Sequence, residues 1–174
     1  MIFVSTPLAG GFVIEPEWSV DERGAFGRIY CGREFTARGI DPRIAQASAS
    51  RNTERGTLRG MHFQRAPFEE AKTVRVTAGA IFDVMVDLRS ESPTYKRWYG
   101  VELSAENGRA LHVPAGFAHG FLTLEASSVV EYMISVDYES SASSGIRWND
   151  PSIGIEWPFQ PTHMSERDRA LPLA

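Results

Sequence analysis

Short runs of Val, Ile, Phe, Tyr and Thr, separated by glycines and prolines, recur along most of the chain. Such runs predict β-strands joined by turns. We expect strands at residues 73–77, 81–87, 97–103, 110–113, 120–124 and 129–136, and a candidate strand at 58–64. Helical patterns are limited to residues 34–39, ending at Gly39, and 165–170, with Ser165 as N-cap. The pattern predicts one all-β domain over residues 1–174, a sandwich or barrel with a few short helices.

Alternation within two of these strands makes further predictions. In residues 81–87, Asp83 and Asp87 share a face with Ile81 and Met85. Two carboxylates among apolar side chains indicate a face that lines a cavity or an interface. In residues 58–64, strict alternation would place His62 on one face and Arg59, Met61 and Phe63 on the other.

Composition and charge exclude several classes of protein. The 174 residues are 43% hydrophobic and 23% charged, with 18 basic and 22 acidic side chains and a net charge of −4. A general nucleic-acid or membrane-surface binder would carry a basic excess, although a local basic pocket for a small anion remains compatible. The single cysteine, Cys31, excludes a disulfide scaffold. Without a basic leader or an apolar run of ~20 residues, the expected location is the cytoplasm.

Two histidines lie in sequence motifs that indicate a functional site. Residues 114–121 form a Pro/Gly turn that delivers His119 onto a strand, a spacing familiar from the second histidine motif of cupin barrels. Metal-binding cupins also carry two histidines one residue apart, followed by Glu, whereas this chain has His62 and Gln64, with Glu69 or Glu70 nearby. Because an amide is a poor ligand for transition metals, we favour a metal-free site. From its own strand alone, His62 is either a base or a hydrogen-bonded structural residue.

The matching motifs extend over nearly the whole chain. Segments 23–26, 56–64, 81–89, 101–107, 114–121, 148–150 and 153–158 occur in an order that resembles the dTDP-4-dehydrorhamnose 3,5-epimerase family. This resemblance, from about residue 10 to 170, implies a cupin-type jelly roll without metal or cofactor. It also implies a homodimer that exchanges strands and pocket residues, and a nucleoside-diphosphate 4-keto-6-deoxyhexose substrate.

The resemblance also assigns catalytic roles. A 4-ketone acidifies the protons on C3 and C5, so each centre can be inverted by a base on one face and an acid on the other. By position, His62 matches the base, Asp168 the carboxylate that orients it, and Tyr132 the proton donor. Lys72 matches the cation near the 4-oxygen, with His119 beside it, and we expect Asp83 to hold Lys72 in place.

Binding roles follow in the same way. Arg23 and Arg59 match residues that hold the diphosphate or the sugar, and Gln46, Ser48 and Arg167 lie in segments near the nucleoside. The resemblance favours Phe26 and Tyr138 as the aromatics that sandwich the base, although Tyr132 and Tyr138 as an isolated pair would suit a core. Arg28 and Ser143 each stand where the family commonly has Glu. We therefore expect the nucleoside end to be recognised differently.

Three alternatives stay open at this stage. One is a mono-epimerase that acts only at C3 or only at C5 of a related sugar. A second is a sugar-nucleotide-binding cupin without catalysis, although the presence of His62, Tyr132 and Asp168 together argues against it. The third is a metal-dependent cupin isomerase or oxygenase.

Overall fold

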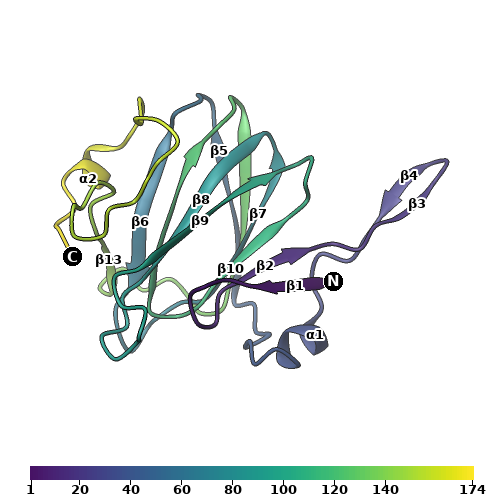
Figure 1. The fold of residues 1–174 in the computed structure, drawn as a ribbon, viewed down its shortest axis with the longest axis horizontal. Helices are drawn as coiled ribbons and strands as arrows, with labels where there is room; N and C mark the ends of the chain where they lie inside the picture. The colour runs from purple at the N-terminus through teal and green to yellow at the C-terminus, as the bar shows by residue number, and fades with distance from the viewer.

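The computed structural model describes residues 1–174, and nearly all of its regular structure is antiparallel β-sheet (Figure 1). The strands are β1 (Ile2–Ser5), β2 (Phe12–Glu15), β3 (Ser19–Asp21), β4 (Gly24–Phe26), β5 (Gln46–Asn52), β6 (Leu58–Gln64), β7 (Lys72–Ala78), β8 (Ala80–Asp87), β9 (Trp98–Ser104), β10 (Ala110–Val113), β11 (Phe117–Thr123), β12 (Ser128–Ile134) and β13 (Ser143–Gly145). The two helices are short, α1 (Gly32–Thr36) and α2 (Glu166–Arg169). The prediction of an all-β fold is confirmed, and no helix is long and apolar enough to cross a membrane.

Two sheets form the body of the molecule. One has six strands in the order β1-β2-β10-β7-β12-β5, and the other has five in the order β13-β6-β11-β8-β9. Strands β3 and β4 pair only with each other, and Figure 1 shows this ribbon projecting away from the two sheets. We call the projecting ribbon, residues 19–26, the arm. The C-terminal segment with α2 lies at the β6 and β13 edge of the body (Figure 1).

The main core lies between the two sheets. Val74, Leu111 and Val130 from the six-stranded sheet meet Ile81 and Phe121 from the five-stranded sheet in one cluster of 12 buried residues. Strand alternation explains this packing, because each strand turns every second side chain inward. The sequence predicted that this face of β8 lines a cavity or an interface. In the structure the face packs into the core between the two sheets, with Ile81 and Met85 in the cluster. Asp83 is fully buried within it.

Several element boundaries differ from the predicted ones. Strand β11 begins at Phe117, earlier than predicted, and β12 ends at Ile134 rather than at residue 136. Helix α1 begins and ends earlier than predicted, because its C-cap is Ala37 and the chain then turns through Gly39, whose φ of 75° is left-handed. Ser165 is the N-cap of α2, as predicted, and its Oγ accepts a hydrogen bond from the Asp168 N–H at 3.1 Å.

Candidate active site

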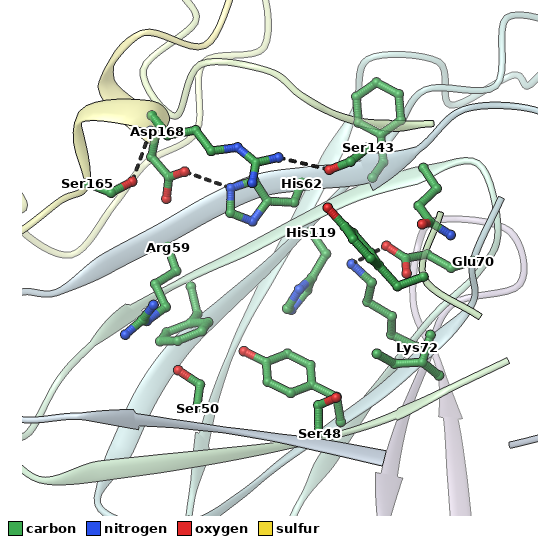
Figure 2. A pocket seen from close by; sticks show the side chains of 17 residues that line it. Ser48, Ser50, Arg59, His62, Glu70, Lys72, His119, Ser143, Ser165 and Asp168 are labelled. Carbon is green, nitrogen blue, oxygen red and sulfur yellow. Dashed lines mark hydrogen bonds and ion pairs between the residues drawn. The ribbon is translucent and has the colours of Figure 1, made fainter. Parts of the chain in front are cut away.

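A polar cavity of about 450 Å³ opens between the two sheets and the C-terminal segment. Its walls come from β5, β6, β7, β11, β12 and β13, together with residues from the loop after β12 and from α2 and its N-cap. Figure 2 shows the side chains that line it, with His119 near the centre and Arg59 and Lys72 on opposite sides in that view. The cavity contains all four residues that the sequence assigned to catalysis, namely His62, Lys72, Tyr132 and Asp168.

A bulge in β6 brings two predicted site residues to the same wall. His62 pairs with His119 of β11, and Arg59 pairs with Phe121, so two residues of β6 lie opposite Gly120 alone. The extra residue breaks the alternation, and both Arg59 and His62 line the cavity, which corrects the prediction of opposite faces. Gly60 makes this bulge feasible, since its φ is 136° and a Cβ there would lie 2.5 Å from the Gly120 Cα.

His62 and Asp168 form the first imidazole–carboxylate pair of the cavity. Nε2 of His62 lies 2.8 Å from Oδ1 of Asp168. Burial acts to raise the pKa of Asp168, but hydrogen bonds from His62, Gly60 N–H and Ser165 hold it below its ordinary value. The carboxylate is therefore ionised, so His62 donates through Nε2 and presents Nδ1 as a base.

The C-terminal segment brings Asp168 next to His62, although the two residues are 106 positions apart in the sequence. Backbone N–H of Arg147 donates to Pro172 O at 2.7 Å, and Nε of Arg147 donates to Leu171 O at 2.9 Å. The Leu171 side chain is 9% exposed. These contacts fix the segment against the sandwich, so the carboxylate that orients His62 is held by tertiary structure.

His119 and Asp83 form a second pair deeper in the molecule. Nε2 of His119 lies 2.7 Å from Oδ1 of Asp83, and the two side chains are 5% and 0% exposed. Oδ2 of Asp83 is buried and has no hydrogen-bond partner. This geometry corrects the prediction that Asp83 holds Lys72.

Lys72 is held by Glu70 instead, with Nζ 2.7 Å from Oε1. Both side chains line the cavity and are about nine-tenths buried. Lys72 is the first residue of β7 and Glu70 lies two positions before it, so an extended chain over residues 70–72 places both side chains on one face. That spacing is the signal by which the sequence could have identified Glu70 as the partner of Lys72.

Tyr132 lies on β12 with its ring edge-on to His119, at a centroid separation of 6.1 Å. Enclosure of the phenol raises the pKa of Tyr132 above its ordinary value of 10, and the charge of Asp83 raises it further, while Arg59 acts in the opposite direction. The phenol therefore keeps its proton throughout the neutral range. This is the state that a proton donor requires.

Two guanidinium groups of the cavity are held by neutral partners. Nε of Arg59 donates to Oδ1 of Asn52 at 2.8 Å, and Nη2 of Arg167 donates to Oγ of Ser143 at 2.8 Å. Lys72, in contrast, has a carboxylate partner. The uncompensated positive charge of the cavity therefore lies at Arg59 and Arg167, which suits a phosphate-bearing ligand.

Four of the predicted binding residues lie outside the cavity of their own chain. Arg23 and Phe26 are on the arm, where the Arg23 side chain is 85% exposed and contacts Asp21, and Phe26 is 82% exposed. Arg28 forms an ion pair with Glu34 at 2.9 Å. Gln46 is adjacent to the site, because its Oε1 accepts a hydrogen bond from the N–H of Tyr138, which does line the cavity. Ser48 and Ser143 line it as predicted.

Gln64 and Glu70 are both engaged with other protein groups. Nε2 of Gln64 donates to Phe68 O at 2.9 Å, and its Oε1 accepts from the N–H of Glu139 at 2.6 Å, so this amide joins two loops at the rim. Glu70 binds Lys72. Neither side chain is free to complete a metal site with His62, and the structure contains no cluster of three or more His, Cys, Asp or Glu arranged for a metal.

Some residues of the cavity were not assigned a role from the sequence. These are Ser50, Phe63, Gln64, Glu70, Phe121, Ile134 and Ser165. Ser50 and Ile134 follow Ser48 and Tyr132 by strand alternation, whereas Ser165 reaches the cavity only through the close approach of the C-terminal segment. A single-strand reading does not contain that information.

Comparison with known proteins identifies the family. The model of the dTDP-4-dehydrorhamnose 3,5-epimerase family matches residues 5–174. A protein of that name from Methanothermobacter thermautotrophicus is 46% identical over 170 residues, which cover 96% of this chain and 91% of the relative. The crystal structure of the Bacillus anthracis dTDP-4-dehydrorhamnose 3,5-epimerase with TDP and PPi bound is 40% identical, with a TM-score of 0.96 and 99% of both chains covered.

A further solved structure is that of ChmJ, a 3'-monoepimerase from Streptomyces bikiniensis, in complex with dTDP-quinovose. It is 33% identical, with a TM-score of 0.89, and the match covers 97% of this chain and 85% of that one. Together with the cupin-type jelly roll and the polar cavity, these matches show that the chain belongs to the dTDP-4-dehydrorhamnose 3,5-epimerase family of isomerases.

Proposed function

We propose that this chain inverts C3 and C5 of dTDP-4-dehydro-6-deoxyglucose to give dTDP-4-dehydro-L-rhamnose. The 4-ketone makes the neighbouring C–H groups acidic, so removal of a proton gives an enolate that can be reprotonated on the opposite face. This chemistry needs a base, an acid and a group that stabilises the enolate oxygen, and it needs no redox cofactor. The observation that carries the proposal is the placement of the His62–Asp168 pair, Tyr132 and Lys72 around one cavity.

His62 is the base in this proposal and Tyr132 the acid. The ionised Asp168 fixes the His62 tautomer and stabilises the imidazolium that forms when His62 takes the sugar proton. Tyr132 keeps its proton until the enolate carbon accepts it, because the pKa of the phenol is raised. Lys72 stabilises the developing charge on the 4-oxygen.

The distribution of charge supports the orientation of the substrate. Arg59 and Arg167 have neutral hydrogen-bond partners, so their charges are available to the diphosphate. Lys72, His62 and His119 each have a carboxylate partner, which limits the net charge around the sugar. The diphosphate therefore binds to the guanidinium groups, and the keto sugar lies among the paired residues.

Deuterium exchange tests the reaction directly. The keto sugar nucleotide is incubated with the enzyme in D₂O, and incorporation at C3 and C5 is followed by NMR. We expect deuterium at both carbons together with formation of the doubly inverted product. Binding without exchange at either carbon would contradict the proposal and favour the non-catalytic binding protein. Activity that disappears on chelation would instead favour a metal-dependent cupin.

A mono-epimerase is the second candidate function, because a 3'-monoepimerase is among the similar solved structures. The same groups serve one centre or two, so the choice depends on how the sugar ring turns inside the cavity. Exchange at one carbon only, with a singly inverted product, would establish this alternative. The D₂O experiment therefore distinguishes the double epimerase from the mono-epimerase in one measurement.

The arm supports a further part of the proposal, a homodimer in which each arm completes the cavity of its partner. Val20 and Phe26 are 75% and 82% exposed on a ribbon that projects from the body (Figure 1). Exposed aromatic and aliphatic side chains on one short ribbon favour burial against another protein surface. In a dimer, Arg23 would reach the diphosphate and Phe26 the base of the ligand in the second subunit.

Complementation between subunits tests this arrangement. His62→Ala damages the cavity of its own subunit, whereas Phe26→Ala damages the arm that serves the other one. If arms are exchanged, a mixed dimer of the two variants has one intact site, so mixing and re-equilibration should restore up to about a quarter of wild-type activity. No recovery in a sample shown by ultracentrifugation to contain mixed dimers would contradict arm exchange.

The nucleotide preference is tested by calorimetric titration with dTDP, UDP, CDP and GDP. Ser143 binds Arg167 at the rim of the cavity, and Arg28 is paired with Glu34 away from it. Arg28 can only donate hydrogen bonds and stands where the family commonly has an accepting Glu, and Ser143 has no charge where Glu is common, so we infer that the nucleoside end is recognised differently from the family pattern. A clear preference for dTDP would contradict that hypothesis and leave the proposed reaction intact.

A further inference from the structure

The proposed reaction leaves a proton imbalance after each inversion, and the inference below rests on that proposed function. His62 has gained the proton of the sugar carbon, and Tyr132 has lost the proton that it gave to the opposite face. Inversion of the second carbon in the same binding event requires a neutral His62 and a protonated Tyr132 once more. One proton must therefore return from His62 to Tyr132 while the sugar occupies the cavity and restricts the access of water.

His119 occupies the position that such a return requires. On the β6–β11 ladder His119 is the direct partner of His62, so the two side chains are cross-strand neighbours. On the other side, the His119 ring lies edge-on to Tyr132 at 6.1 Å between centroids. Figure 2 shows His119 in the middle of the cavity, below His62. His119 therefore adjoins both groups whose protonation states must be restored.

Asp83 gives His119 the means to hold a proton in a nearly dry environment. Asp83 is fully buried, and Oδ2 has no partner, so the only hydrogen bond of this carboxylate is to Nε2 of His119. A buried carboxylate with a single partner depends on that hydrogen bond for its compensation, so Nε2 of His119 keeps its proton. With Nε2 committed to Asp83, Nδ1 is the His119 atom that is free to give or take a proton.

We propose that the His119–Asp83 pair returns the proton from His62 to Tyr132 between the two inversions. The Nδ1 proton of the His119 imidazolium passes to the phenolate oxygen of Tyr132, and neutral His119 then takes a proton from the His62 imidazolium. No direct hydrogen bond joins His119 to either residue, so each transfer crosses a hydroxyl of water or of the bound sugar. Overall, one N–H bond breaks at His62, one O–H bond forms at Tyr132, and His119 and Asp83 are unchanged.

The charge of Asp83 also favours the direction of this return. A phenolate close to a buried carboxylate is destabilised, which is one of the causes of the raised pKa of Tyr132. Asp83 therefore promotes reprotonation of Tyr132 and also holds Nε2 of His119 by its hydrogen bond. Its role is that of a positioning residue, because it acts through His119 and does not line the cavity.

The test is the ratio of deuterium incorporation at the two carbons in D₂O, measured under single-turnover conditions for the wild-type enzyme and for Asp83→Asn. Loss of the carboxylate charge leaves an amide of the same shape. We expect the rate at the second carbon, relative to the first, to fall at least ~10-fold, with accumulation of a singly inverted sugar. His119→Gln should shift the ratio in the same direction.

Asp87→Asn is the matched control. Asp87 lies on the same strand, is equally buried and does not line the cavity, so its substitution tests for a general effect of removing a buried carboxylate from β8. We expect Asp87→Asn to lower thermal stability and to leave the ratio of the two exchange rates unchanged. Circular dichroism confirms that each variant is folded before its kinetics are compared.

The outcomes distinguish the relay from the proposed function. If the wild type exchanges both carbons and Asp83→Asn slows them equally, the relay is wrong and the proposed reaction stands. If the wild type exchanges only one carbon, no second inversion occurs and both the double epimerisation and the relay are overturned. A ratio that falls in Asp83→Asn and in Asp87→Asn alike would also overturn the relay, because the effect would then be structural.

Discussion

The two imidazole–carboxylate pairs of the cavity differ in their access to water. The His62 side chain is 37% exposed and Asp168 is 6% exposed, whereas His119 and Asp83 are 5% and 0% exposed. Asp168 accepts an additional hydrogen bond from the backbone N–H of Gly60, while Oδ2 of Asp83 accepts none. The same two residue types thus form a solvated pair at the rim and a dry pair in the interior.

The two carboxylates also reach their histidines by different routes. Asp83 lies on β8, which is bonded directly to β11, so its position follows from the register of the five-stranded sheet. Asp168 comes from the C-terminal segment, far along the chain, and is held there by contacts outside the sheets. The rim pair is placed to exchange protons with the substrate, whereas the interior pair exchanges them only with its neighbours in the cavity.

Replacement of the rim imidazole should have the largest effect. We expect His62→Ala to reduce exchange at both carbons at least ~100-fold, because no other group of the cavity is placed as the base. Initial rates and D₂O exchange measure this loss. Near-normal turnover in His62→Ala would remove the distinction between the two pairs, since the interior pair would then be able to perform the first proton abstraction.

Removal of the phenol hydroxyl should have an effect of similar size. Tyr132→Phe keeps the ring that packs beside His119 and deletes only the proton that is donated. We expect at least a ~100-fold loss in the rate of inversion. Proton abstraction and return on the same face should survive better than inversion, which is visible as exchange without product. If inversion persists at the wild-type rate, Tyr132 is not the acid.

The pH dependence of kcat should distinguish the two imidazole–carboxylate pairs, because Asp83 and not Asp168 raises the pKa of Tyr132. Because the pKa of Tyr132 is raised above 10, the acid form persists into the alkaline range and this group causes no loss of rate below about pH 10. In Asp83→Asn one cause of the raised pKa of Tyr132 is removed, so this pKa falls and the alkaline decline should begin at a lower pH than in the wild type. Asp168→Asn should not move this limb. A pH–kcat profile for the three proteins checks the assignment.

The smallest expected effect lies at the rim hydroxyl. Ser143 accepts a hydrogen bond from Arg167 at 2.8 Å, and both side chains are partly exposed. Ser143→Ala should raise KM about two- to threefold with little change in kcat, because an exposed hydrogen bond of this kind contributes less than about 1 kcal/mol. Substrate saturation curves measure it. A large fall in kcat would show that the rim takes part in the chemical step.

Much of the fold could be predicted from the sequence because strands leave a local signature. The runs of β-branched and aromatic residues identify β7, β8, β9 and β10 to within one or two residues, and Ser165 identifies the start of α2. The chemical groups of the site were identified by resemblance, and the cavity contains His62, Lys72, Tyr132 and Asp168 together. The partners of these groups were harder to predict.

The partner of Lys72 illustrates the limit. The sequence offers Glu69, Glu70 and Asp83 as carboxylates, and the choice between them depends on distances across strands. Asp83 is committed to His119 by the register between β8 and β11, which leaves Glu70 for Lys72. Alternation along a single strand gives the face of a residue and does not give its neighbour on the next strand.

The sequence by itself predicted the strands β6 to β12 and the two short helices, and its family resemblance proposed the residues for base, acid and cation, whereas β1 to β5 and β13 were not predicted. Only the tertiary structure decided how these residues are combined. The bulge at Gly60 brings Arg59 and His62 to one wall, and the C-terminal segment brings Asp168 to His62. The arm leaves Arg23 and Phe26 outside the cavity of their own chain. The reason is physical: side-chain direction within a strand follows local geometry, whereas hydrogen bonds and ion pairs depend on distances between segments far apart in the chain.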